Sequence, residues 1–228
     1  MHLHSINVSK PKLRRFGFKF YSTAFLKKPV NGPVILTKDN FVGDKQADLM
    51  NHGGNDKAVY GFSTQHHDYW QQKLGLDHIN YGKFGENLSI SGLDESEIAI
   101  GDRIQINDCI LEVSQPRIPC YKISFEFKEM SMLNSFIDYA HTGVYFRVIQ
   151  AGTMIESSPV ELIYKHPDNI TVKNLFRAYF DSKFPNQEQV LRTAITIPEL
   201  AEAWRSKMVT IVHRIDQYHQ RQNKENKT

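Results

Sequence analysis

The chain has 228 residues, a formal net charge of +3 and two cysteines. This length can bury a core of ordinary size without disulfide staples, and the cysteines lack the paired spacing of a structural zinc site. Basic and acidic residues are mixed, the N-terminus has no basic leader, and no apolar run approaches the ~20 residues that span a bilayer. We therefore expect a cytoplasmic protein without a nucleic-acid or membrane partner.

Short alternating segments separated by turns dominate residues 1–165, which is typical of β structure. The clearest element is a hairpin in which apolar residues alternate on both sides of the Asn107-Asp108 turn. Its second strand leads into residues 116–120, and residues 144–149 form another alternating strand. We predict a mainly β fold, a mostly antiparallel barrel with one or two embedded helices.

One embedded helix is predicted over residues 65–74. Ser63 can cap its start, and Gly75 can end it in a left-handed conformation. His66 lies on its inner face. Because the adjacent His66 and His67 point away from each other on a helix, they do not match the i, i+4 pair of a zinc protease, and we do not expect a histidine metal site.

Helix start signals replace the strand pattern after residue 165, and we predict a three-helix domain over residues 166–218. Thr171 can cap the first helix, and Asn186 and Thr196 can begin capping boxes for the second and third. The organisation is therefore a barrel domain followed by a small helical domain.

The third C-terminal helix carries an apolar stripe that includes Trp204 and Met208. If both are buried, the stripe is the core of the helical domain; if exposed, it could dock a partner. Residues 219–228 are polar, and we expect a disordered tail.

Cys120 carries the strongest indication of chemistry. Pro116 and Pro119 restrict the backbone that leads to it, so the thiol can be aimed. Arg117 and Lys122 lie nearby in sequence, and positive charge favours the nucleophilic, metal-ligating thiolate. The alternative is a small buried core residue, since free cysteine is among the most buried residue types.

Three further features suggest anion or ligand binding. Gly53 and Gly54 precede Lys57, and consecutive backbone N–H groups in such a turn can form an anion-binding nest. Asn87 offers a donor and an acceptor, and Arg147, within a strand, suits bidentate oxyanion binding. Ordinary turns and a solvent-facing arginine are the structural alternatives.

Three blocks in this order resemble the MOSC family, named after the C-terminal domain of the molybdenum cofactor sulfurase. The blocks are GDKQAD at residues 43–48 leading to HGGNDKAVY at 52–60, FGENL at 84–88 running to IGDR at 100–103, and QPR at 115–117 with Pro119-Cys120. The appended helices are similar to those of the YiiM-like branch, which is associated with resistance to 6-N-hydroxylaminopurine. The resemblance covers nearly the whole chain.

The resemblance implies a pterin-based molybdenum cofactor, with Cys120 as the metal ligand at the mouth of a cleft. The candidate residues for the cofactor phosphate and pterin are Gly53, Gly54, Lys57, Asn87, Arg117 and Arg147. The candidate catalytic residues are Cys120, Glu86, His52 and Asp56. The implied activity is reduction of N-hydroxylated compounds to amines, with electrons from an external donor or reductase protein.

Two alternatives remain from the sequence. A carrier could hold a persulfide on Cys120, or hand over the molybdenum cofactor without turnover. Pyridoxal phosphate is a weaker alternative, because a phosphate site and a lysine suggest it but no lysine lies in a recognisable Schiff-base motif. The oligomeric state stays open, with a dimer among the options.

Overall fold

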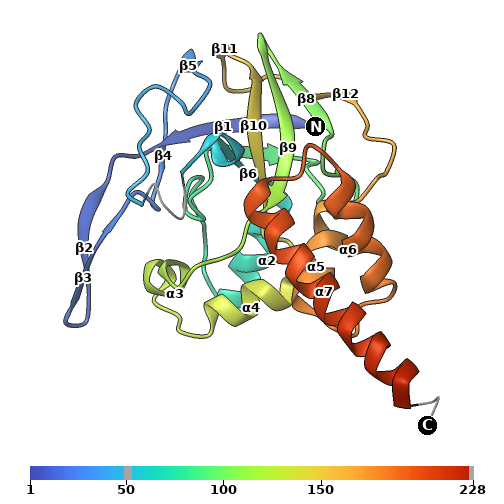
Figure 1. Cartoon of the computed structure of the whole chain (residues 1–228). Coiled ribbons are helices and arrows are strands. Elements are labelled where there is room, and N and C mark those ends of the chain that lie inside the picture. The colour runs from blue at the N-terminus through green and yellow to red at the C-terminus, as the bar shows by residue number, and fades with distance from the viewer. Residues whose placement is uncertain (49–52, 226–228) are drawn as a thin grey trace.

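A curled sheet forms the centre of the molecule in the computed structural model, which describes residues 1–48 and 53–225. Its eight strands are, in spatial order, β12 (Glu161–Tyr164), β8 (Arg103–Ile106), β9 (Cys109–Pro116), β10 (Val144–Gln150), β6 (Val59–Ser63), β7 (Leu88–Ser91), β1 (His2–Val8) and β4 (Lys28–Pro29). Among these described strands, β6 and β7 pair in parallel and the other neighbours pair antiparallel. The mainly β fold class is confirmed as a partial barrel built on a mixed sheet (Figure 1).

The predicted hairpin is β8 and β9, with Ile106 paired to Cys109 around the turn. Asn107 adopts a positive φ of 51°, a conformation that asparagine tolerates better than most residues. β9 pairs with β8 on one side and with β10 on the other. The segment leading to Cys120 therefore leaves a central strand.

Two small sheets and a short 3-10 helix complete the β part. The strands are β2 (Lys12–Phe16) paired with β3 (Lys19–Thr23), and β5 (Val34–Leu36) paired with β11 (Gly152–Met154); the 3-10 helix is η1 (Asn55–Lys57). The β2–β3 hairpin extends away from the main sheet (Figure 1).

Three α-helices, not one or two, are embedded in the described residues of the β part: α2 (Thr64–Leu74), α3 (Lys122–Phe127) and α4 (Met132–Tyr139). For α2 the predicted Gly75 terminus is confirmed, with φ 62°. The other two were missed because they are too short for an apolar period to stand out from single residues.

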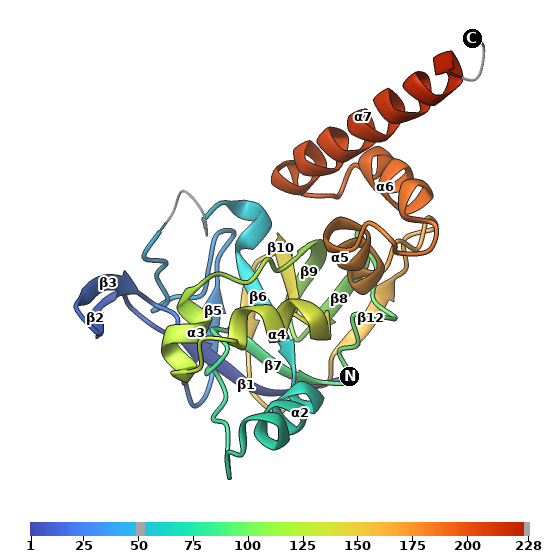
Figure 2. The ribbon, with the colours of Figure 1, turned by 90° about the horizontal axis from the view of Figure 1, so that it is seen from below.

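The C-terminal part contains α5 (Val172–Phe180), α6 (Gln187–Thr196) and α7 (Glu202–Glu225) (Figure 2). The Thr171 cap is confirmed, because its Oγ1 accepts a hydrogen bond from Asn174 N at 3.2 Å. The other two predicted capping boxes are wrong. Asn186 is the N-cap residue of α6, as predicted, but its backbone is left-handed and its side chain makes no capping hydrogen bond, whereas Thr196 ends α6 instead of starting α7.

The predicted disordered tail is also wrong over residues 219–225, which continue α7. The polar residues there are mostly good helix formers, and they extend a helix whose first turns are anchored by burial. Trp204 and Met208 are 1% and 0% exposed, so the apolar stripe is core and the partner-docking alternative is not supported.

One continuous apolar core joins the sheet to the C-terminal helices. It contains Leu3 and Val113 from strands together with Leu175 and Trp204 from helices. The predicted boundary near residue 165 therefore marks a change of secondary structure within a shared core. Among the residues described, no helix combines the length and apolarity required to cross a membrane.

Candidate functional site

Cys120 lies between β9 and α3, where two neighbouring cavities meet. It is partly exposed and lines both cavities. Asp48, Lys57, Lys122 and Tyr145 also line both. The structure therefore places the predicted thiol in a cleft with two lysines, rather than in the apolar core.

The backbone before Cys120 is tied to the loop that precedes β10. Arg117 N donates to Gly143 O at 3.2 Å, and Thr142 Oγ1 donates to Arg117 O at 2.8 Å. Beyond the cysteine, Ile123 N donates to Cys120 O at 3.1 Å as α3 begins. These bonds add to the restriction imposed by the two prolines, so the backbone that carries the Cys120 thiol is held in place.

Arg117 is buried in the wall of the first cavity. Its Nη1 donates to Tyr60 Oη and to Phe84 O, both at 2.8 Å, and its guanidinium lies over the Tyr60 ring at 4.7 Å from the centroid. Burial raises the pKa of Tyr60, and its hydroxyl donates to Thr142 O at 2.7 Å. The guanidinium is thus a fixed positive charge beside the cleft.

Several lining residues had no predicted role. Phe25 comes from the segment after β3, which had carried little indication of function, and the first cavity also contains a buried ion pair between Lys27 Nζ and Asp44 Oδ1 at 2.6 Å. Burial lowers the pKa of Lys27, although Asp44 opposes the shift. Asp44 belongs to the first family block, so only that block could have indicated it.

The second cavity, of about 450 Å³, lies between the Cys120 segment and the start of α7. Ala203, Trp204 and Lys207 of α7 line it together with Lys57. Burial lowers the pKa of Lys57, and the charge of Lys207 acts in the same direction. The predicted Lys57 is therefore at the cleft, facing a helix that the sequence had assigned to a separate domain.

Asn87 lines the first cavity, but its amide is used to hold the wall together. Its Oδ1 accepts from Tyr60 N at 3.1 Å, while Nδ2 donates to Asn7 O at 3.2 Å and to Asp44 Oδ2 at 3.0 Å. Both amide donors are engaged, so its evident role is to fix neighbouring strands around the cavity.

Glu86 is fully buried and is not among the described residues that line either cavity. Its carboxylate accepts from Gly82 N at 2.7 Å, from Phe84 N at 3.0 Å and from Ser89 Oγ at 3.0 Å. These bonds brace the loop before β7. Since a side chain without exposure cannot touch a substrate, this placement gives no support to the predicted catalytic role.

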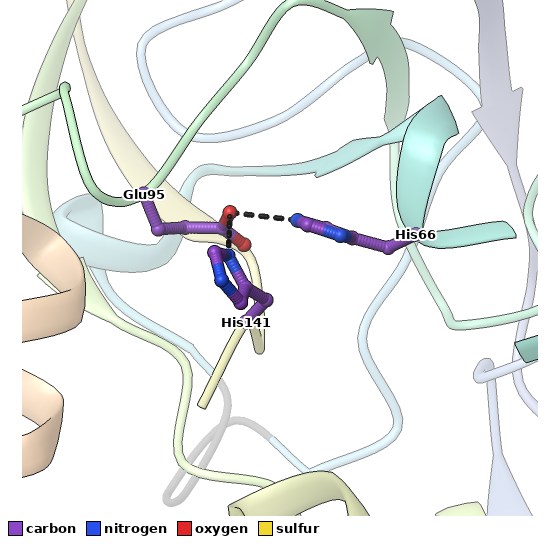
Figure 3. A group of neighbouring side chains, drawn as sticks. All are labelled: His66, Glu95 and His141. Carbon is purple, nitrogen blue, oxygen red and sulfur yellow. Dashed lines mark hydrogen bonds and ion pairs between the residues drawn. The ribbon is translucent and has the colours of Figure 1, made fainter. Parts of the chain in front are cut away.

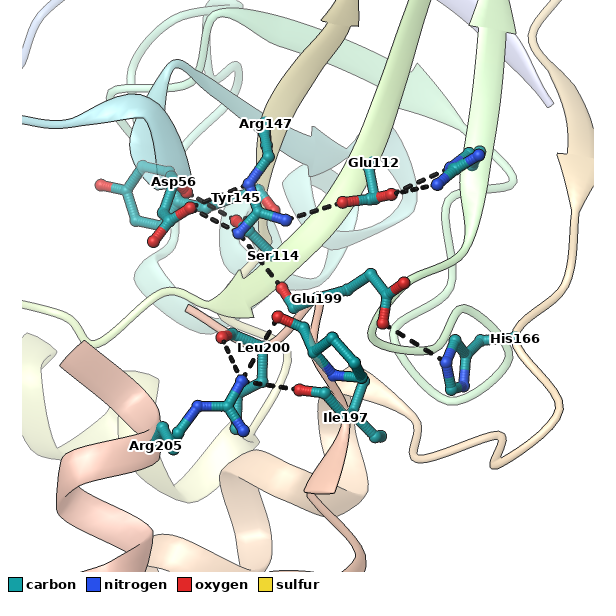
Figure 4. A network of polar contacts seen from close by, with 12 residues as sticks. Asp56, Glu112, Ser114, Tyr145, Arg147, His166, Ile197, Glu199, Leu200 and Arg205 are labelled. Carbon is teal, nitrogen blue, oxygen red and sulfur yellow. Dashed lines mark hydrogen bonds and ion pairs between the residues drawn. The ribbon is translucent and has the colours of Figure 1, made fainter. Parts of the chain in front are cut away.

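Arg147 and Asp56 are partners of each other in a polar network (Figure 4). Arg147 Nε donates to Asp56 Oδ1 at 2.9 Å, Nη1 donates to Glu112 Oε1 at 2.7 Å, and Nη2 donates to Glu199 O at 3.2 Å. The network connects η1, β9, β10 and the segment before α7. Neither Arg147 nor Asp56 is among the described lining residues, so the structure indicates a connecting role for both.

The double-glycine turn, Gly53 and Gly54, directly follows residues 49–52, which are outside the described part of the chain. Gly54 has a φ of 95° and its carbonyl accepts from Lys57 N at 2.9 Å, so a left-handed backbone is what requires glycine there. Gly53 and Gly54 are not among the described lining residues. The candidate catalytic residue His52 lies outside the described residues.

A separate cluster contains His66, Glu95 and His141, a combination that could hold a metal ion (Figure 3). Glu95 Oε2 lies 2.8 Å from His66 Nε2 and 3.0 Å from His141 Nδ1, and Lys173 Nζ lies 2.7 Å from His141 Nε2. A lysine ammonium only donates, so His141 accepts through Nε2 and keeps its proton on Nδ1. A metal at Nδ1 would displace that proton, and the geometry favours a hydrogen-bonded network.

Comparison with known proteins finds a matching family model and several similar proteins. A model of the MOSC domain matches residues 48–161. The uncharacterized protein YflK of Bacillus subtilis is 35% identical over 204 residues, which cover 89% of this chain and 90% of that protein. Protein YiiM of Escherichia coli is 33% identical over 153 residues, which cover 66% of this chain and 68% of YiiM.

Two further similarities concern a reductase and a solved structure. A protein named reductase from Gibberella moniliformis is 29% identical over 159 residues, which cover 68% of this chain but 28% of the reductase. The crystal structure of YiiM from Geobacillus stearothermophilus has a TM-score of 0.76 at 26% identity, covering 91% of this chain and 97% of that one.

Proposed function

Because the chain belongs to the MOSC domain family, we propose that it is a molybdenum-cofactor-dependent oxidoreductase that reduces N-hydroxylated compounds to amines. The observation that carries the proposal is the position of Cys120, a partly exposed thiol where two cavities meet beside lysine side chains. The reductase name of one relative supports the class of reaction.

The residues around Cys120 fit the cofactor that the family implies. Thiolate is a soft ligand of the kind that transition metals with sulfur ligands accept, so Cys120 would hold the molybdenum. Lys57, Lys122 and Arg117 would face the cofactor phosphate and polar pterin. All three line the first cavity together with Cys120, and the two lysines also line the second. Gly53, Gly54 and Asn87 would shape the surroundings.

The overall reaction consumes two electrons and two protons, converting R–NHOH to R–NH₂ and water. When bound, the cofactor would supply the two-electron chemistry, and the electrons would come from an external donor or reductase protein. Lys57 is our candidate for delivering a proton, because its lowered pKa makes it a better acid than an ordinary lysine. Tyr145 keeps its proton, since burial raises its pKa, and can donate a hydrogen bond to substrate.

The test is replacement of the thiol. Cys120→Ala, purified from a host that makes the cofactor, should lose most of its bound molybdenum and its reduction of 6-N-hydroxylaminopurine with an artificial electron donor. Its melting temperature should stay close to that of the wild type, because a partly exposed side chain contributes little packing.

Cys109→Ala is the matched control, since it removes the other thiol from a buried strand position. It should retain molybdenum even if it melts slightly earlier. Wild-type protein without molybdenum and without reductase activity would refute the proposal, and molybdenum retained by Cys120→Ala would refute the ligand role.

A carrier remains the second candidate, because a partly exposed thiolate can also take the outer sulfur of a persulfide donor, which leaves as its own thiolate. A labile sulfur adduct on Cys120 by mass spectrometry, with no turnover in molybdenum-loaded protein, would favour a persulfide carrier over the enzyme. The pyridoxal phosphate alternative gains no support from the family or its relatives. We propose a cytoplasmic location, where both free cysteines would stay reduced.

A further inference from the structure

The β2–β3 hairpin has one packed face and one free face. Arg14 lies opposite Tyr21 across the two strands, and Phe16 shares their side of the hairpin. This side rests on α3: Arg14 Nε lies 3.3 Å from Glu126 Oε1, and Tyr21 Oη donates to the same oxygen at 3.1 Å. The Phe16 ring stacks on that of Phe125, with centroids 4.2 Å apart. A two-stranded hairpin is marginally stable alone, so these contacts are what hold it in place.

The opposite face of the hairpin carries large apolar side chains in solvent. Leu13 and Phe20 lie on it and are 73% and 65% exposed, and Phe18 in the connecting turn is 96% exposed. Arg15 lies directly opposite Phe20 in the register, and its guanidinium is 5.8 Å from the centre of that ring. Exposed apolar side chains gathered in one place mark a contact site, whereas singly scattered ones are ordinary.

Positive charge surrounds this free face. Residues 9–23 contain no aspartate or glutamate, and their cations are Lys10, Lys12, Arg14, Arg15 and Lys19. All of these cations are exposed. Lysines along the edge of a hairpin also prevent unwanted strand pairing, which is the structural alternative. That alternative explains the charge but not the exposed leucine and phenylalanines, because apolar side chains promote association.

The hairpin continues directly into the wall of the first cavity. Thr23, the last residue of β3, lines that cavity, and so does Lys27. On the other side of the hairpin base, α3 begins two residues after Cys120, and Lys122 Nζ donates to Ser22 O at 3.4 Å. A partner docked on the hairpin would therefore sit next to the cavity that contains Cys120.

We propose that the free face of the β2–β3 hairpin is the docking surface for a small acidic electron-transfer protein of the ferredoxin or flavodoxin kind. The cationic hairpin is complementary to an acidic surface, which speeds the encounter, and the exposed apolar side chains supply the contact. A second copy of this chain is electrostatically disfavoured, because a cationic hairpin would meet a molecule of net charge +3. One short hairpin face also suits transient electron-transfer interfaces, which lie below about 1,200 Å², better than the larger interfaces of obligate dimers.

The partner's task rests on the proposed function, which needs electrons from outside the chain. Two reduced ferredoxin molecules give up one electron each and are oxidised, and these electrons with two protons convert one R–NHOH to R–NH₂ and water. Docking on the hairpin shortens the path of the electrons to the Cys120 cavity, since the segment that leaves the hairpin forms part of the cavity wall.

The first test reverses charge. Full-length protein, purified from a host that makes the cofactor, is titrated with oxidised plant-type ferredoxin and with flavodoxin by isothermal titration calorimetry, at low and at high salt. Arg15→Glu combined with Lys19→Glu leaves the Arg14 anchor intact and should weaken binding at least about tenfold. Lys165→Glu combined with Arg221→Glu reverses two exposed cations elsewhere and should change binding less than about twofold. High salt should weaken binding to the wild type more than binding to the charge variant.

The second test removes the apolar contact. Phe18→Ser combined with Phe20→Ser should weaken binding about five- to tenfold. Tyr218→Ser is the control, since Tyr218 is 61% exposed on α7, at the other side of the molecule from the hairpin (Figure 2), and it should leave binding unchanged. All variants should melt close to the wild type, because the replaced side chains are exposed.

Turnover separates the docking surface from the proposed function. With an artificial small donor, the hairpin variants should reduce 6-N-hydroxylaminopurine as fast as the wild type. With reduced ferredoxin or flavodoxin, their kcat/KM for the donor should fall by the same factor as binding. If the wild type has no activity with the artificial donor, the proposed function fails, and the binding measurements alone decide whether the docking surface exists.

The docking surface is refuted if the wild type binds neither acidic protein, or if the hairpin variants bind as tightly as their controls. Hairpin-dependent binding to phosphatidylserine vesicles or to a DNA oligonucleotide, without binding to either acidic protein, would assign the face to a membrane or a nucleic acid instead. A dimer in sedimentation equilibrium that the hairpin variants dissociate would assign it to a second copy of the chain.

Discussion

Burial gives the two cysteines of this chain different chemical characters. Cys109 is fully buried on β9, and burial, together with the charge of Asp108, raises the pKa of its thiol to about 11. Such a thiol stays protonated and acts as a small apolar side chain. Cys120 is eleven positions further along, at a partly exposed position in the cleft. Exposure, rather than residue type, is what makes Cys120 accessible to a ligand and Cys109 inaccessible.

The pKa of Glu95 is likewise set by its surroundings. Burial raises its pKa, but hydrogen bonds from His141 and His66 outweigh burial and lower the pKa to about 2. Gly143 N adds a further bond at 2.9 Å. The carboxylate therefore stabilises the fold in its charged form, and that stabilisation depends on pH.

We expect Glu95→Gln to lower the free energy of unfolding at neutral pH by about 3 kcal/mol. Because the folded pKa is lower than the unfolded value, the contribution is fully present above about pH 4.5 and is lost as the pH falls towards about 2. Urea unfolding across this range should show the gap between wild type and variant closing. Glu97→Gln, an exposed control, should show no gap, and a gap for Glu95→Gln that is independent of pH would contradict the argument.

At the scale of elements, Arg147 connects parts of the chain that are distant in sequence. It reaches from β10 to Asp56 in η1, to Glu112 in β9 and to the carbonyl of Glu199 before α7 (Figure 4). Glu112 is almost completely buried and also pairs with Arg103 at 2.9 Å. The network therefore holds Lys57 and Lys207, on either side of the cleft, through the elements that carry them.

Arg147→Ala should destabilise the protein by roughly 2 kcal/mol, because it leaves Glu112 and Asp56 without their main cation; partial exposure reduces the cost below that of a fully buried pair. Hydrogen exchange should become faster at η1 and at the start of α7. Arg103→Ala, which removes the more exposed partner of Glu112, should cost less than about 1 kcal/mol. Unchanged stability together with lost molybdenum would instead support the predicted cofactor contact of Arg147.

At the scale of the whole molecule, the sheet and the C-terminal helices share one core. Val113 of the sheet and Trp204 of α7 belong to the same buried cluster, and Lys173 N of α5 donates to Glu95 O at 2.8 Å. The helices therefore complete the wall of the cleft and also cover part of the sheet. The two predicted domains therefore share one buried core in this arrangement.

Thermal unfolding should accordingly show one cooperative transition by calorimetry, with equal calorimetric and van't Hoff enthalpies. Trp204→Ala should lower the free energy of unfolding of the entire chain by about 3–5 kcal/mol, because it removes a large buried side chain. Val209→Ala, at an exposed position on the same helix, is the control and should change it little. Two separate transitions would instead support independent domains.

Local features of the sequence determined much of this protein. The β8–β9 hairpin, the restricted approach to Cys120, the Thr171 cap and the Gly75 terminus each depend on a few adjacent residues, so they could be predicted. The family blocks predicted that Cys120, Lys57 and Arg117 belong to one site, and all three line the first cavity. Short helices such as α3 contain too few residues for an apolar periodicity to be detected. The capping pattern at Thr196 was misleading because Thr196 is the last residue of α6.

Only the tertiary structure decided which polar residues face the cleft. Glu86 and Arg147 carry the same functional groups whether they brace the protein or bind a ligand. Their burial and their hydrogen-bond partners, which only the folded structure shows, are what favour the bracing role. Lys207 and Cys120 are far apart in the chain, so no local pattern could place them on one cavity. Sequence determines chemistry and local conformation because these act over a few residues, whereas burial and charge clustering arise from contacts between distant ones.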